Sequence, residues 1–226
     1  ISFKINKGQT LAIIGATGSG KTTLISLIPR FYDATDGEVL VDGVNVKNYK
    51  FDTLYDKLGY VTQKAVLFAG SIRENVFFGE SAAPETDEEL KNAIELSQAE
   101  EFVDKLPDGT EHMISQMGRN VSGGQKQRLS IARALSRKPE ILVFDDSFSA
   151  LDYKTDAKLR EGLNEKLKDT TKIIVAQRIS TIRHADKIIV LDRGEAVGMG
   201  THEELMKSCD VYKEIALSQL SAAELA

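Results

Sequence analysis

The sequence predicts an α/β fold with a mostly parallel sheet, an antiparallel β lobe and a helical subdomain. Short apolar or β-branched runs alternate with helical patterns along much of the chain, which is typical of a parallel sheet with right-handed crossovers. Asp42-Gly43 lies between two β-rich runs, 38–41 and 44–46, and is a strong hairpin signal. Helical patterns dominate between residues 86 and 137, which indicates a separate helical part.

The first elements surround a glycine-rich loop. Residues 10–14 form a short apolar run suited to a buried strand. Residues 21–28 continue as an apolar-periodic helix, which Pro29 is expected to end. Beyond the predicted hairpin, residues 58–62 are expected to form another strand that ends at Gln63.

The second half of the chain repeats the alternation. Thr86 and Glu89 predict a capping box for a helix over 87–97, and a second short helix over 99–106 is expected to stop at Pro107. Thr201 and Glu204 form another predicted capping box, which starts a last pair of helices. The remaining expected elements are strands over 141–144, 172–176 and 187–191, and helices over 125–137, over 154–168 and around 179–183.

The composition is that of an ordinary globular protein. The chain has 226 residues, of which 42% are hydrophobic and 28% charged. The net charge of −5 argues against a nucleic-acid partner, because phosphate backbones attract basic faces. The one cysteine, Cys209, excludes an intrachain disulfide and fits a reducing compartment. No apolar run approaches the roughly 20 residues that span a bilayer.

The start of the chain suggests a piece of a longer protein. Ile1 stands where an initiator Met is expected, and Phe3 and Ile5 alternate directly into the predicted strand over 10–14.

Residues 15–22 read GATGSGKT and match the phosphate-binding pattern GxxxxGK[ST]. In this pattern backbone N–H groups cradle a polyphosphate, Lys21 can reach the β- and γ-phosphates, and the Thr22 hydroxyl can ligate Mg²⁺. The alternative is a glycine-rich turn that only caps a helix. The flanking strand and helix favour a nucleoside triphosphate site on a P-loop core. Its candidate residues are Gly15, Ala16, Thr17, Gly18, Ser19, Gly20, Lys21, Thr22 and Thr23.

Two other patterns suit a metal and a second phosphate. The apolar run before Asp145 would carry this carboxylate to the carboxyl edge of a sheet, where it can bind Mg²⁺ through water beside Thr22. The alternative is an aspartate that only caps a strand. Ser122-Gly123-Gly124 precedes a helix and offers N–H groups and a hydroxyl to an anion. In isolation these three residues would be read as an ordinary N-cap.

The order and spacing of these motifs resemble the nucleotide-binding domain of ATP-binding cassette (ABC) transporters over nearly the whole chain. Residues 68–76 are similar to the exporter branch of that family in particular. The matching segments are 15–22 (Walker A), Gln63 (Q-loop), 121–125 (signature), 141–145 (Walker B), 149–152 (D-loop) and Gln177 (switch position).

The resemblance implies one domain over 1–226, with a RecA-like core and β lobe over 1–85 and 138–226 and a helical insert over 86–137. It implies ATP and Mg²⁺ as cofactors, with Thr22, Gln63 and Asp145 at the metal. Two such domains pair head to tail, so each ATP lies between the Walker A motif of one domain and the signature of the other. Further implied nucleotide contacts are Ser122, Gly123, Gly124, Gln125 and Asp152. The domain would serve a transmembrane domain at the cytoplasmic face of the cell membrane.

Two positions depart from family members that hydrolyse ATP well. Such members have Glu directly after the Walker B aspartate, where this chain has Asp146, shorter by one methylene or about 1.5 Å. They have His at the switch position, where this chain has Gln177, which cannot become a cation. With Lys21 and Gln63, these residues form the expected catalytic set. Loss of a general base typically removes ~10²–10⁴-fold in rate, so we expect slow hydrolysis at this site.

The intact signature beside an altered base resembles the impaired half of a heterodimeric exporter, whose partner polypeptide would carry the Glu and the His. One alternative is a fully active homodimeric exporter, in which aspartate serves almost as well. Another is an ABC-type ATPase that acts on DNA or ribosomes, but the expected basic surfaces and coiled-coil inserts do not occur in the sequence. A P-loop kinase or GTPase would not explain the signature segment.

Overall fold

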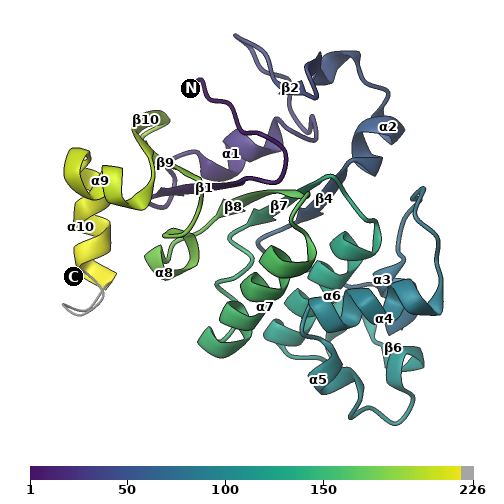
Figure 1. Ribbon diagram of the computed structural model, residues 1–226. Helices are drawn as coiled ribbons and strands as arrows, with labels where there is room; N and C mark the ends of the chain where they lie inside the picture. Colours follow the sequence, from purple (N-terminus) through teal and green to yellow (C-terminus); the bar gives the residue numbers. More distant parts are fainter. Residues whose placement is uncertain (220–226) are drawn as a thin grey trace.

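The centre of the fold is a six-stranded sheet with the order β10-β9-β1-β8-β7-β4 (Figure 1). The structure is a computed structural model and describes residues 1–219, so residues 220–226 of the predicted domain lie outside the described part. All neighbouring strands are parallel except β10, which runs antiparallel to β9. The predicted α/β class is therefore confirmed. The strands are β1 (Thr10–Gly15), β4 (Leu58–Val61), β7 (Ile141–Asp145), β8 (Thr171–Val175), β9 (Lys187–Asp192) and β10 (Glu195–Gly200).

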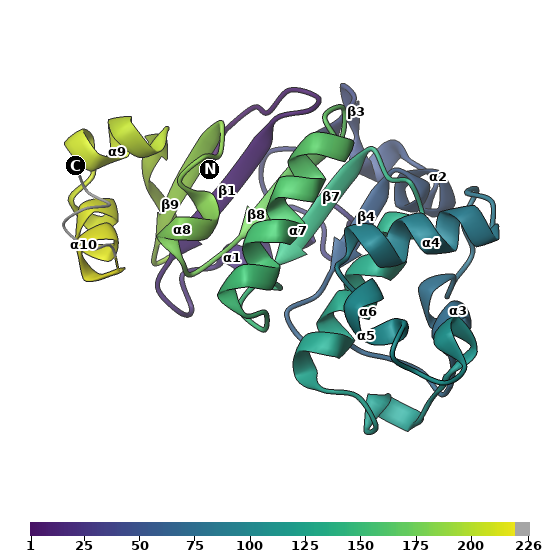
Figure 2. The same cartoon turned by 60° about the horizontal axis from the view of Figure 1, so that its bottom comes forward.

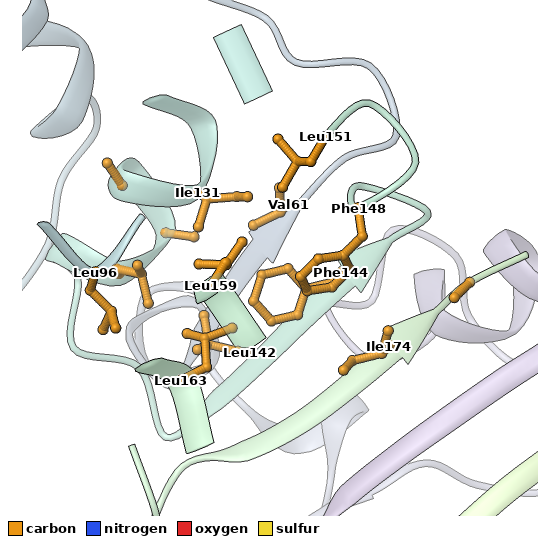
Figure 3. Close-up of a cluster of buried hydrophobic side chains, with 14 of the residues drawn as sticks. Val61, Leu96, Ile131, Leu142, Phe144, Phe148, Leu151, Leu159, Leu163 and Ile174 are labelled. Carbon is orange, nitrogen blue, oxygen red and sulfur yellow. The ribbon is translucent and has the colours of Figure 1, made fainter. Parts of the chain in front are cut away.

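Helices cover both faces of this sheet. Alternate side chains of a strand point to opposite faces, and β7 shows the consequence. Phe144 packs with Leu159 of α7 (Tyr153–Lys166), as Figure 3 shows. Val143, the preceding residue, packs on the opposite face with Ile25 of α1 (Lys21–Ser26). The strands are thus buried on both sides, and their carboxyl ends are held in fixed positions.

The predicted hairpin forms a small ribbon of β2 (Leu40–Val41) and β3 (Val44–Asn45). Asp42 and Gly43 have φ of 51° and 77°, the positive values that a tight two-residue turn requires. A short 3₁₀ turn (Val46–Asn48) and α2 (Phe51–Asp56) lead from the ribbon to β4.

A group of helices lies beyond the β4 edge of the sheet (Figures 1 and 2). In this group α6 packs against both α3 and α4. Helix α3 was not predicted, although Ser71 and Glu74 form its capping box. The members of the group are α3 (Ile72–Val76), α4 (Asp87–Leu96), α5 (Glu100–Val103), α6 (Gly123–Ser136), β5 (Gly70–Ser71), β6 (Met113–Ile114) and the 3₁₀ turns Gly109–Glu111 and Gln116–Gly118.

The last helices lie at the opposite end of the molecule, beside β9 and β10 (Figure 1). They are α9 (His202–Ser208) and α10 (Asp210–Gln219), and the predicted capping box of Thr201 with Glu204 is confirmed. Helix α8 (Ile179–Ile182) packs against α10. None of the helices within residues 1–219 combines the length and the apolar character that crossing a bilayer requires.

Some local expectations are wrong. Helix α1 ends at Ser26 rather than at residue 28, because a residue that precedes a proline is disfavoured in helical conformation. Glu89 does not complete its capping box, since its carboxylate pairs with Lys138.

Candidate nucleotide-binding site

The sheet register brings most of the predicted site residues to one edge. Ile13 of β1 is opposite Val175 of β8, which is itself opposite Asp145 of β7. On the other side of β7, Val61 of β4 is opposite Phe144. The segments that leave these strands therefore begin side by side at the carboxyl edge of the sheet. These segments carry the loop at residues 15–22, Gln63, Asp145, Asp146 and Gln177.

The glycine-rich loop connects β1 to α1 and depends on two of its glycines. A Cβ atom on Gly15 would lie 2.1 Å from the carbonyl oxygen of Leu191 in β9, so only glycine fits where the loop leaves the sheet. Gly20 has a φ of 95° and caps α1. The first bond within this helix runs from Leu24 N to Gly20 O, which leaves the preceding N–H groups free of helical partners. Residues 16–18 are exposed at the mouth of the loop.

The Lys21 ammonium folds back over this loop. It donates hydrogen bonds of 2.8 Å to the carbonyl oxygens of Gly15 and Ala16, and a longer one of 3.4 Å to Ser19 Oγ. Burial lowers the pKa of Lys21, whereas the nearby charges of Asp146 and Asp145 oppose that shift. The loop thus carries a positive charge beside the carbonyl oxygens of Gly15 and Ala16, within the segment predicted to bind a phosphate.

Thr22 and Asp145 form a candidate metal site. The Thr22 hydroxyl donates a hydrogen bond of 2.9 Å to Asp145 Oδ1. Burial raises the pKa of Asp145, and the hydrogen bond from Thr22 opposes that change. Mg²⁺ takes one or two oxygen ligands from a protein and the others from water and phosphate. A hydroxyl and a carboxylate at this spacing beside the loop fit that requirement.

Asp146 is the meeting point of two glutamine side chains. Gln177 Nε2 donates to Asp146 Oδ2 at 2.6 Å, and Gln63 Nε2 donates to the same oxygen at 3.2 Å. Gln63 was also predicted at the metal with Thr22 and Asp145, and that role stays a prediction; its amide donates to Asp146, the residue after Asp145. Gln63 reaches this oxygen from the segment after β4, and Gln177 reaches it from the segment after β8.

The backbone of Asp146 is in the left-handed region, with a φ of 47°. A non-glycine residue in this region typically costs of order 1–3 kcal/mol and persists only when its surroundings hold it. Here Asp146 N donates to Val175 O, and Ser149 Oγ donates to Asp146 O at 2.7 Å. These bonds aim the carboxylate at the two glutamines.

The second predicted phosphate site lies at the start of α6 in the helical group. Ser122 Oγ accepts from Gln125 N, and Gln125 Oε1 accepts from Ser122 N at 2.8 Å. This capping box uses the Ser122 N–H and the Gln125 side chain that were expected to face an anion. Ser122 and Gly123 are exposed. Within residues 1–219, no hydrogen bond or ion pair joins residues 122–125 to the loop at 15–22.

Asp152 caps α7. Its carboxylate accepts from Thr155 N at 3.0 Å and from Thr155 Oγ1 at 2.7 Å. These bonds lower the pKa of Asp152. Asp152 and Thr23 are exposed, and within residues 1–219 no hydrogen bond or ion pair joins either of them to Asp146 or Lys21.

Two contributors to the site were missed in the sequence. Gly194 N, in the turn between β9 and β10, donates to Ser19 O at 3.1 Å and supports the loop. The turn signal Arg193-Gly194 between two β-rich runs could have revealed it. Gln219 contacts the backbone that carries Gln177, and no local pattern marks that residue.

Comparisons with known proteins give matches over most of this chain. The family described as ABC transporter matches residues 1–149. An uncharacterized ABC transporter ATP-binding protein of Mycobacterium tuberculosis is 47% identical over 226 residues, which cover 99% of this chain and 38% of that protein. A proposed multidrug export ATP-binding/permease protein of Bacillus subtilis is 43% identical over 215 residues, which cover 95% of this chain and 37% of that protein.

Among solved structures, a bacterial Atm1-family ABC exporter with ATP bound is similar, with a TM-score of 0.88 and 35% sequence identity. The match covers 93% of this chain and 37% of the exporter chain. The chain thus spans less than two fifths of the length of these relatives.

Proposed function

The chain belongs to the ABC transporter family, and from that premise we propose that it is the ATP-binding domain of a membrane exporter, with slow hydrolysis at its own ATP site. The proposal of slow hydrolysis rests on one observation: Asp146 Oδ2 accepts hydrogen bonds from both Gln63 and Gln177. The proposed substrate of this site is MgATP, and the proposed location is the cytoplasmic face of the cell membrane.

In this proposal the loop at residues 15–22 holds the triphosphate. The Lys21 ammonium exchanges its bonds to the carbonyl oxygens of Gly15 and Ala16 for phosphate oxygens. The N–H groups at the start of α1 and along residues 16–20 donate to the same anion. Thr22 and Asp145 would hold Mg²⁺, the second directly or through water. The metal, when bound, supplies charge neutralisation to the β- and γ-phosphates.

The proposal of slow hydrolysis rests on the reach and the partners of Asp146. A general base must lie within hydrogen-bond distance of the attacking water. The carboxylate of Asp146 is about 1.5 Å shorter in reach than that of glutamate. One of its oxygens already accepts two amide hydrogen bonds, which must rearrange before that oxygen can orient a water. Gln177 can donate to a γ-phosphate but adds no positive charge to it.

We also propose a head-to-tail pair with a second nucleotide-binding domain on another polypeptide. The exposed start of α6 would complete the partner's ATP site with Ser122 and the N–H groups of Gly123 and Gly124. The exposed Asp152 would lie at the same interface. A transmembrane domain of the same protein would couple this pair to transport. Nucleic acid is not among the proposed partners, because the net charge is −5.

The proposal is tested by comparing two variants in the full-length complex, purified from membranes. Ser122→Ala should abolish most of the steady-state ATPase activity, because it removes a donor at the partner's γ-phosphate. Donors that stabilise a transition state contribute ~10²–10³-fold in rate. Asp146→Ala should cost the complex much less, since its own site contributes little turnover.

Ser218→Ala is the matched control for Ser122→Ala, because among residues 1–219 the Ser218 hydroxyl donates only to Ile215 O in its own helix. This variant should retain full activity. Equal losses from Ser122→Ala and Asp146→Ala would refute the asymmetric pair and favour a symmetric, fully active homodimer. Two other variants, Lys21→Ala and Thr22→Val, test the nucleotide site itself. If both bind ATP as well as the unaltered chain does, the site is refuted.

A further inference from the structure

The side chain of Gln219, at the end of α10, holds the backbone of the segment that carries Gln177. Gln219 Nε2 donates to the carbonyl oxygen of Gln177 at 2.8 Å, and Gln219 Oε1 accepts from Ile179 N at 2.9 Å. One carboxamide thus bridges both sides of Arg178. We call residues 176–178, between β8 and α8, the switch loop.

Helix α8 depends on this bridge for its first turn. Its N-cap residue, Arg178, makes no side-chain capping bond, and the Arg178 guanidinium instead lies 3.5 Å from Ser149 O. The first N–H groups of a helix have no partner within the helix and need one elsewhere. Gln219 supplies that partner to Ile179 from an element 40 positions further along the chain.

Helix α10 is firmly anchored where it presents Gln219. Tyr212 and Ala216 are fully buried and belong to the same core cluster as Ile179 and Ile182 of α8, and α10 packs against α8. The Tyr212 hydroxyl also lies 2.7 Å from His202 Nδ1 of α9. Gln219 follows Ala216 by one helical turn, so its carboxamide has a fixed starting point.

The side chain of the same residue, Gln177, donates to Asp146 Oδ2 at 2.6 Å. The backbone of Gln177 is therefore held by α10 while its amide touches the residue proposed as the base. A shift of the Gln177 carbonyl would move the amide relative to both Asp146 and a bound γ-phosphate.

We propose that Gln219 is a positioning residue for Gln177, and that α10 thereby sets how the site distinguishes ATP from ADP. This inference rests on the proposed role of Gln177 at the γ-phosphate. It requires two measurable effects of removing the Gln219 carboxamide. The switch loop opens more often, and Gln177 contributes less to the preference for ATP.

The first experiment measures amide hydrogen exchange by mass spectrometry in the full-length complex. Gln219→Ala should raise the exchange rate of the peptide that covers residues 177–182 by roughly threefold to tenfold, the usual effect of losing a hydrogen bond. Ser218→Ala, one position earlier on the same helix, should leave that peptide unchanged. Unchanged exchange in Gln219→Ala would overturn the proposal.

The second experiment measures the ratio of the ADP and ATP dissociation constants. ADP or ATP competes against photoreactive ATP, and the label is counted on this chain. Gln219→Ala should lower the ratio by about twofold to fivefold. A role confined to stability would weaken ATP and ADP alike and leave the ratio unchanged.

A double-mutant cycle completes the test. Gln177→Ala should lower the ratio at least as much as Gln219→Ala, and the double variant should be no worse than Gln177→Ala alone. Losses that multiply in the double variant would overturn the inference. If Gln177→Ala itself leaves the ratio unchanged, Gln177 has no role in the preference for ATP. This inference then fails as well, even if the exchange experiment shows that Gln219 holds the switch loop.

Discussion

Thr22 and Asp145 lie 123 positions apart in the chain and share a hydrogen bond of 2.9 Å from Thr22 Oγ1 to Asp145 Oδ1. The first residue stands at the start of α1 and the second at the end of β7. Their contact joins the glycine-rich loop to the acidic edge of the sheet. It also pairs two oxygen atoms of the kind that Mg²⁺ prefers.

Thr22→Val should make nucleotide binding nearly indifferent to magnesium. Valine preserves the shape of threonine but removes the hydroxyl, so one metal ligand is lost. We expect the affinity for ATP in Mg²⁺ to fall by about tenfold, and the affinity in EDTA to change little. Titration of the chain with a fluorescent ATP analogue in both buffers checks this. Thr53→Val, an exposed threonine in α2, is the control. A similar loss of affinity in both buffers would contradict the metal role of Thr22.

Lys21→Ala should weaken ATP binding by about tenfold to a hundredfold. The ammonium lies over the loop on three oxygen atoms, and a charged hydrogen bond to phosphate is worth ~1.5–3 kcal/mol. The same titration measures the effect, with Lys7→Ala at an exposed position as the control. An unchanged dissociation constant would show that the loop does not bind the triphosphate as proposed.

The double change Asp146→Glu with Gln177→His should raise ATP hydrolysis by about tenfold or more in a full-length complex whose partner site is silenced by Ser122→Ala, if an intact signature of the partner faces the site of this chain. Glutamate extends the carboxylate toward the attacking water, and histidine can become a cation beside the γ-phosphate, so both proposed deficits are repaired. General base catalysis is typically worth ~10²–10⁴-fold. Release of inorganic phosphate is the measurement, with each single change assayed alongside. Brisk hydrolysis in the Ser122→Ala complex before the double change, and no gain after it, would show that the two departures have no effect on rate.

Gly15→Ala should strongly destabilise the fold. The added Cβ atom would lie 2.1 Å from Leu191 O, a backbone atom of β9, so the sheet or the loop must shift. We expect the free energy of unfolding to fall by about 2–4 kcal/mol, in the range of overpacked or strained sites. Urea denaturation of the chain measures it. Gly123→Ala is the matched variant, because its Cβ meets nothing within 4 Å; equal midpoints for the two variants would contradict the steric argument.

The sequence by itself determined the features that depend on neighbouring residues. The GATGSGKT loop, the Asp42-Gly43 turn and the capping box of Thr201 with Glu204 each rely on backbone sterics and short-range hydrogen bonds, which act within a few positions. Alternating strand and helix patterns likewise predicted the α/β class. For these features the residue pattern predicts the local backbone geometry directly.

Only the tertiary structure decided which distant side chains meet. Gln63 and Gln177 stand 83 and 31 positions from Asp146, yet both donate to one of its oxygens, and Gln219 reaches Gln177 across 42 positions. Sheet order and the direction in which each loop leaves its strand set these contacts, and neither is encoded in a local pattern. Gln63 was predicted as a site residue and its role at a metal stays a prediction, whereas its hydrogen bond to Asp146 was not predicted from the sequence. The Gln63 amide reaches Asp146 because Gln63 follows β4 and Asp146 follows β7. These two strands are neighbours in the sheet, where β7 lies between β4 and β8.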